Sequence, residues 1–175
     1  MRRRDLLVAL AAGPAMLAAG CYKRIDSGES LSKELTTIAV PTFRNPSLRY
    51  RVEQRFTDAI TRELLRRERR LRVVTDQEHA DLVMTGEIKD VRSGGALLDD
   101  TGRTRVFSVV VVAGVTLRDQ KHGKVVFDNQ RMVFRGEYEL AGDPQSFFNE
   151  ENPAFDRIAA DFASSVVSTI LLGAM

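Results

Sequence analysis

The pattern of apolar and polar residues predicts two amphipathic helices. Between residues 48 and 67, large apolar residues recur every four positions, which places them on one buried stripe: Val52, Phe56, Ile60 and Leu64. A similar stripe predicts a last helix: Phe155, Ile158, Phe162, Val166 and Ile170. Asparagine favours a helix cap and proline the first helical position, so Asn152 and Pro153 predict where this helix begins. Residues 142–151 are then expected to form a polar loop.

Alternating apolar residues predict strands around these helices. Short strands at 36–43 and 71–74 flank the first helix, and longer strands at 81–92, 106–117 and 124–138 follow as an antiparallel meander. Valines on both faces of 106–117 favour the centre of the sheet for this strand.

Glycines and adjacent apolar pairs predict local irregularities. Gly86 indicates a close neighbour or a bulge, and apolar neighbours such as Val126 and Phe127 indicate a bulge in the last strand. Gly94 and Gly95 predict that residues 93–102 form a loop.

The order of these elements predicts an α+β fold. We expect a two-layer sandwich with a four- to five-stranded mixed sheet and both helices on one face. With 175 residues in all, the chain has room for one ordinary domain, which we assign to residues 34–175.

The first 33 residues carry targeting information. Three arginines precede an apolar run over 6–19 that is too short to span a bilayer, which predicts a secretory signal over 1–20. The small residues before Cys21 resemble a lipobox, although Ala18 stands where leucine is usual, so we predict that Cys21 becomes a lipidated N-terminus. An ordinary signal that leaves Cys21 as a free thiol is the alternative. General secretion and twin-arginine export both stay open. The polar residues 21–33 are expected to form a tether.

Charge changes the picture once the signal is removed. Residues 1–20 contain three arginines and one aspartate, so 23 basic and 23 acidic residues remain of the 26 and 24 in the whole chain. This neutral balance gives no argument for a nucleic acid partner. Cys21 is the only cysteine, so the chain forms no internal disulfide. Membrane attachment is therefore expected to come from the lipid on Cys21.

Residues suited to catalysis do not form a recognisable pattern. His79 and His122 are the only histidines, and neither has further ligand types at metal spacing. The sequence has neither a Gly-x-Ser-x-Gly elbow nor the Gly-Lys-Ser/Thr ending of a phosphate loop. We therefore predict a protein that is not an enzyme and binds no cofactor or metal.

One charged cluster follows the first helix. It contains Arg66, Arg67, Arg69 and Arg70, with Arg62 and Arg72 beside it. Cations are stabilised at a helix C-terminus by its dipole, so a solvated helix end explains the cluster without a ligand. The functional hypothesis is a contact with a phosphate or a sugar acid, since guanidinium groups bind such groups through paired hydrogen bonds.

Taken in order, several short segments resemble the LptE family of lipopolysaccharide-assembly lipoproteins. They are the Gly20-Cys21-Tyr22 start, Ile-Ala-Val-Pro-Thr-Phe-Arg-Asn at 38–45, Ala-Asp-Leu-Val-Met-Thr-Gly-Glu-Ile at 80–88, and the helix over 157–172. The resemblance covers nearly all of the chain after the signal.

The resemblance implies a lipoprotein on the periplasmic side of the outer membrane. Members of the family sit in the lumen of the barrel LptD in a one-to-one complex, help it assemble and assist lipopolysaccharide delivery to the outer leaflet. Strand edges and the segments 93–102 and 142–151 are then candidate barrel contacts. With this family in view, the phosphate hypothesis for Arg66, Arg67, Arg69 and Arg70 becomes one of a contact with lipopolysaccharide phosphates. The alternative is a lipid-anchored periplasmic carrier or sensor that binds a small amphiphile between helices and sheet.

Overall fold

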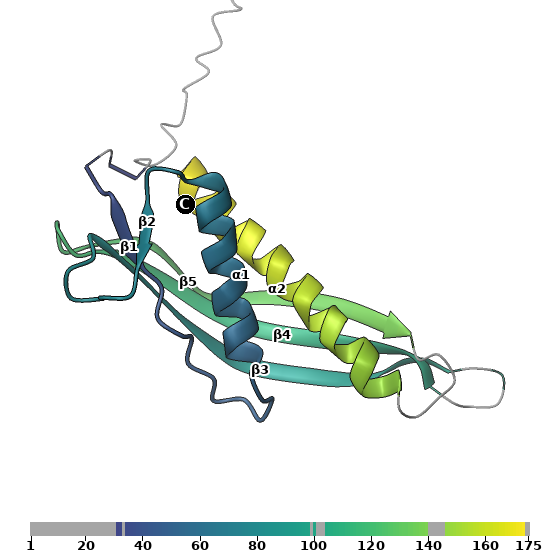
Figure 1. The fold of residues 1–175 in the computed structure, drawn as a ribbon. Helices are drawn as coiled ribbons and strands as arrows, with labels where there is room; N and C mark the ends of the chain where they lie inside the picture. The colour runs from purple at the N-terminus through teal and green to yellow at the C-terminus, as the bar shows by residue number, and fades with distance from the viewer. Residues whose placement is uncertain (1–30, 33, 99, 101–103, 140–145, 174–175) are drawn as a thin grey trace, which may run out of the picture.

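A computed structural model describes residues 31–173, apart from 33, 99, 101–103 and 140–145. The elements of this part of the chain, in order, are β1 (Thr37–Ala39), α1 (Val52–Arg67), β2 (Arg72–Val74), β3 (Leu82–Leu98), β4 (Thr104–Asp119), β5 (Lys124–Glu139) and α2 (Ser146–Leu172). Figure 1 shows the two helices side by side on one face of the sheet. The predicted two-layer α+β sandwich is confirmed.

The sheet is mixed and has the strand order β2-β1-β3-β4-β5. β1 pairs in parallel with both β2 and β3, whereas β3, β4 and β5 form an antiparallel meander. The central strand is β3, so the prediction that 106–117 is central was wrong. β1 pairs with one side of β3 and β4 pairs with the other. The valine-rich β4 therefore lies between β3 and the edge strand β5.

Aromatic rings fill the layer between helices and sheet. The side chain of Phe162 on α2 is fully buried and contacts Phe43, Phe56 and Phe134, with ring centroids 6.1, 4.9 and 5.4 Å away. These partners come from the segment after β1, from α1 and from β5. Burial of each such side chain stabilises the fold by about 1.5–3 kcal/mol, so one ring links four segments.

β3 continues beyond its predicted end. Ser93 and Gly94 pair with Val109 and Ser108 of β4, so residues 93–98 form strand and the loop predicted over 93–102 was wrong there. Residues 99, 101 and 102 of that segment lie outside the described part. Glycine weakens a strand but keeps its backbone donor and acceptor, and a long neighbouring strand is available to pair with both.

The predicted irregularities in the sheet are confirmed. A Cβ atom at Gly86 would lie 2.5 Å from Cδ2 of Phe43, so this ring is the close neighbour. In β5 the register shifts twice against β4, between the partners of Ala113 and Val115 and between those of Leu117 and Arg118. Each shift inserts one extra residue in β5, which is a bulge.

α2 begins earlier than predicted, at Ser146, and Pro153 lies inside the helix. The predicted start at Asn152 and Pro153 was therefore wrong, and so was the predicted loop 142–151 where it covers residues 146–151. Residues 142–145 of that loop lie outside the described part. Asn152 lies inside the helix and not at its cap, and its Oδ1 accepts a hydrogen bond from Nη2 of Arg55 at 2.9 Å. Contacts with the α1 side hold this turn helical although proline removes one helical hydrogen bond.

α1 begins at Val52, four residues after the start of the predicted segment. Arg51 adopts a left-handed backbone with a φ of 60°, which separates the preceding turn from the helix. β1 is also shorter than predicted and ends before Pro41, and Arg44 then forms a single bridge with Glu87.

Candidate functional site

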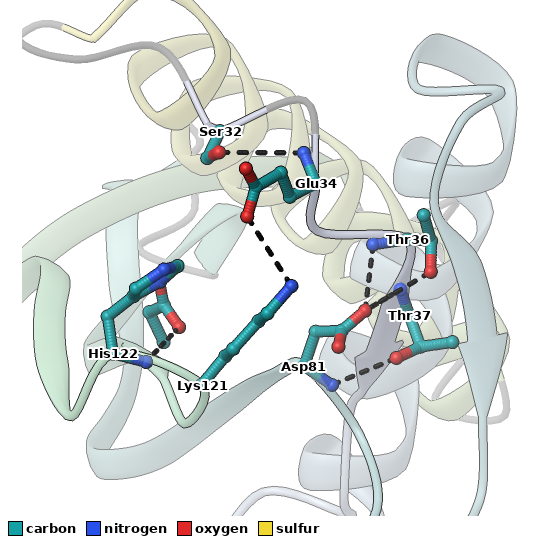
Figure 2. A network of polar contacts seen from close by, with 8 residues as sticks. Ser32, Glu34, Thr36, Thr37, Asp81, Lys121 and His122 are labelled. Atoms are coloured by element: carbon teal, nitrogen blue, oxygen red, sulfur yellow. Dashed lines mark hydrogen bonds and ion pairs between the residues drawn. The ribbon is translucent and has the colours of Figure 1, made fainter.

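Hydrogen bonds connect Asp81 to Thr36 and Thr37 near the start of the described chain, and we call these three residues the Asp81 latch (Figure 2). Oδ2 of Asp81 accepts hydrogen bonds from the backbone N–H groups of Thr36 and Thr37 at 2.8 and 3.0 Å and from the Thr36 hydroxyl at 3.2 Å. The backbone N–H of Asp81 donates in return to the Thr37 hydroxyl at 2.9 Å. These donors, first the Thr36 backbone, lower the pKa of Asp81 to about 2. The carboxylate thereby fastens the start of β1 to the start of β3.

A cleft of about 450 Å³ lies beside this latch. It is lined by Leu31, Ser32, Leu35, Asp119, His122, Lys124 and Val126. Leu31 and Leu35 are buried in the main core, so packing on the domain already includes Leu31, a residue of the expected tether. Nδ1 of His122 lies 2.7 Å from Oδ2 of Asp119. Burial acts to raise the pKa of Asp119, but hydrogen bonds from His122 outweigh it and leave the pKa lowered.

Both histidines lie in loops or turns, where each pairs with the aspartate three residues before it. His79 pairs with Asp76 at 2.7 Å in an exposed loop, and His122 pairs with Asp119 in the turn between β4 and β5. In the described ranges, no group of three or more His, Cys, Asp or Glu side chains could hold a metal ion.

Two arginines of the predicted phosphate cluster contact acidic and polar side chains at the end of α1. Arg66 pairs with Glu63 at 2.7 Å, and Arg67 pairs with the same carboxylate. Arg67 also donates to the hydroxyls of Ser164 and Ser168 on α2, at 3.0 and 2.5 Å. These contacts join the two helices, so Arg67 has a structural role.

The other two arginines of the cluster lie in the turn after α1. Arg70 pairs with Glu68 at 3.0 Å. Arg69 is exposed and forms no ion pair with any residue that the structure describes. The structure therefore brings the four arginines to one end of the molecule, and within the described part of the chain Arg69 is the one whose guanidinium forms no ion pair. The phosphate contact of Arg66, Arg67, Arg69 and Arg70 stays a prediction.

The face of the sheet opposite the helices carries a valine strip. Val110 and Val112 alternate along β4 with the buried Val109 and Val111, so they point away from the helices. Val133 of β5 pairs with Val112 and is 47% exposed. Figure 1 shows that neither helix covers this face.

The turn before α1 displays two large apolar side chains, Leu48 and Tyr50, which are strongly exposed. Asn45 holds this turn by donating from Nδ2 to the Arg49 carbonyl at 2.7 Å and to Glu53 at 2.6 Å. Sequence analysis missed this surface because it included residue 48 in the first helix. The sequence Asn45-Pro46-Ser47 predicts the turn itself, but it does not predict that the side chains of Leu48 and Tyr50 are exposed.

Cys21 and most of the predicted tether lie outside the described residues. For residues 31–173, with their gaps, neither helix combines the length and the apolar character that crossing a bilayer requires.

The fold and these surfaces are those of a compact α+β domain suited to binding other molecules. Its polar clusters, in the described residues, connect segments of the chain to one another. A match to a family model identifies the family of this domain. The model, described as "LptE: Lipopolysaccharide-assembly", matches residues 35–170. The chain belongs to the LptE family of lipopolysaccharide-assembly lipoproteins, as the resemblance predicted, and is a component of lipopolysaccharide transport.

Solved structures share the fold at low sequence identity. Uncharacterized lipoprotein B from Nitrosomonas europaea is 14% identical with a TM-score of 0.54, over 78% of this chain and 83% of that one. Rare lipoprotein B from Shewanella oneidensis is 11% identical with a TM-score of 0.50, over 77% and 92%. A PelC dodecamer subunit from Paraburkholderia phytofirmans is 14% identical with a TM-score of 0.52, over 82% and 92%. A search of curated proteins finds no significant match.

Proposed function

We propose that this lipoprotein sits in the lumen of the outer-membrane barrel LptD, helps the barrel assemble and assists the delivery of lipopolysaccharide to the outer leaflet. The observation that carries the proposal is the family match over residues 35–170, which runs from before β1 to the last turns of α2. The role is one of binding and support, without catalysis.

The shape and surface of the domain support a place inside a barrel. A barrel lumen is polar, so a plug needs a closed core and a mostly polar exterior. The rings around Phe162 close the core, and charged residues such as Arg131, Arg135 and Glu137 are exposed on β5. β5 is also an edge strand, whose outer backbone groups are open to pairing. β5 and the valine strip are therefore the surfaces that we assign to the barrel.

The anchor completes the proposal. Lipid on Cys21 would hold the chain to the outer membrane from the periplasmic side, with the residues that follow acting as a tether. Intact mass analysis of the protein from membranes tests this step: a mass increase from acyl chains is expected, and an unmodified Cys21 thiol would remove the anchor from the account.

The carrier alternative needs space between the helices and the sheet. In the structure, the ring of Phe162 and its aromatic neighbours occupy that layer, and the cleft of about 450 Å³ lies instead beside Leu31. This packing favours the plug.

A crosslinking experiment tests the proposed contact. A photoreactive residue replaces Val133 in the chain produced in its own cells, and irradiation is expected to join the chain to one large barrel protein. The same residue at Asp58, which is exposed on α1, shows whether the contact is specific to the sheet face. Capture of a small amphiphile and no protein at Val133 would favour the carrier and contradict the plug.

A further inference from the structure

Unpaired cations and one apolar side chain gather at the end of α1. Arg62, Arg69 and Arg72 are exposed, and none of them forms an ion pair with a residue in the described part of the chain. Leu65 follows Arg62 on the exposed face of α1 and is 55% exposed. The stretch 62–72 has six arginines and two glutamates, so its net charge is positive. Arg72 precedes Val73, which packs against the core between helices and sheet, so the Arg72 side chain points to the side of the sheet away from the helices. We name Arg62, Leu65 and Arg69 the α1-end patch.

This patch lies where the described chain begins. The backbone N–H of Arg72 donates to the Thr36 carbonyl at 2.8 Å, and Arg67 contacts Ser168 near the end of α2. Figure 1 shows the end of α1, the end of α2 and the entry of the chain at the same end of the molecule. Leu31 follows Cys21 by ten residues, which reach at most about 34 Å when extended. A lipid on Cys21 therefore keeps this end near the bilayer surface.

The chemistry of the patch matches a phospholipid surface. Guanidinium groups bind phosphate oxygens through paired hydrogen bonds, and an exposed leucine beside them can enter the boundary between headgroups and acyl chains. Each arginine near an anionic leaflet favours the bound orientation by about fivefold. The lipid supplies attachment, so the patch would determine the orientation of the domain.

We propose that the α1-end patch docks on the anionic phospholipid headgroups of the leaflet that holds the lipid of Cys21. The inference rests on the proposed lipidation, and it adds a second, electrostatic contact with the membrane. It differs from the predicted lipopolysaccharide contact of Arg66, Arg67, Arg69 and Arg70 in its ligand and in most of its residues.

Because the chain has a single cysteine, a fluorescent probe can be attached at one chosen position. Once Cys21 carries lipid, Leu172→Cys provides the only free thiol for a fluorescent probe, and Leu172 is 70% exposed one helical turn after Ser168. The purified lipidated chain is placed in phosphatidylcholine vesicles with or without phosphatidylglycerol, and a headgroup-attached quencher reports contact. Leu48→Cys places the probe before the other end of α1 as a positional control.

Quenching at residue 172 is expected to require phosphatidylglycerol and to be absent at residue 48. Replacing Arg62 and Arg69 with glutamine should lower the ratio of docked to undocked protein by about 25-fold at low salt. Replacing Arg44 and Lys89 with glutamine removes the same charge from other exposed positions and should change nothing.

Three results would overturn the proposal: equal quenching in both vesicle types, equal loss in both double variants, or quenching only after lipopolysaccharide is added. Mass analysis before reconstitution verifies the lipid on Cys21, and no barrel is present. A negative result therefore concerns the patch, and it is distinct from failure of the anchor or of the plug.

Discussion

At position 86 the chain lacks a side chain because the ring of Phe43 occupies that space. We predict that Gly86→Ala lowers the free energy of unfolding by about 1–3 kcal/mol, since the added methyl group must displace a buried ring. Denaturant unfolding measures the change. Gly94→Ala on the same strand is the matched control, because a Cβ there meets no atom within 4 Å. Equal losses for the two variants would show that strand propensity, and not the Phe43 contact, is responsible.

At the residue scale, we expect Asp81 to make the stability of the fold depend on pH. Its pKa in the folded chain is about 2 against an ordinary value of 3.8, so the charged carboxylate stabilises the fold above pH 3.8, and this contribution is lost as the pH falls towards 2. Asp81→Asn should cost about 1 kcal/mol at neutral pH, and the difference from the parent chain should shrink steeply as the pH falls from 4 towards 2. Urea unfolding across this range measures it, with the exposed Asp58→Asn as the control. A difference that persists unchanged at pH 2 would contradict the latch.

At the scale of elements, one ion pair joins the turn before α1 to α2. The carboxylate of Glu151 is 8% exposed and binds Arg49 at 3.0 Å, and Arg49 also donates to Ser93 on β3. Arg49→Met should destabilise the fold by about 2 kcal/mol, because it leaves a buried charge without its partner. Arg92→Met, which removes a more exposed pair with Asp90, should cost less than about 0.5 kcal/mol.

A double variant separates this pair from simple loss of packing. Glu151→Gln added to Arg49→Met should recover part of the stability, because it removes the uncompensated charge. Thermal or denaturant unfolding of the four chains gives the coupling. Additive losses would mean that the two side chains act independently.

The same elements show what the sequence could predict. Periodicity placed Phe56 and Phe162 on buried faces, because a period near four leaves one packing solution for a helix on a sheet. Local sequence patterns could not predict the start of α2, because Arg55, about a hundred residues away along the chain, donates a hydrogen bond to Asn152. Gly94 and Gly95 misled for the same reason: pairing with β4 outweighs their preference for a loop.

For the candidate site, the sequence predicted a cluster and not its contacts. That Arg67 joins the two helices follows from the position of Ser164 and Ser168, which only the packed structure reveals. The Leu48 and Tyr50 turn was missed because its exposure depends on the left-handed Arg51.

At the scale of the whole molecule, the chain is a closed α+β domain of the LptE family, and we propose that it acts by occupying the lumen of a larger barrel. The most direct test is native mass spectrometry of the chain purified through a C-terminal tag from outer membranes. We predict one lipidated copy bound to one large barrel protein. Recovery of the chain as a monomer from the soluble fraction, or of a self-assembled oligomer without a barrel, would contradict the account.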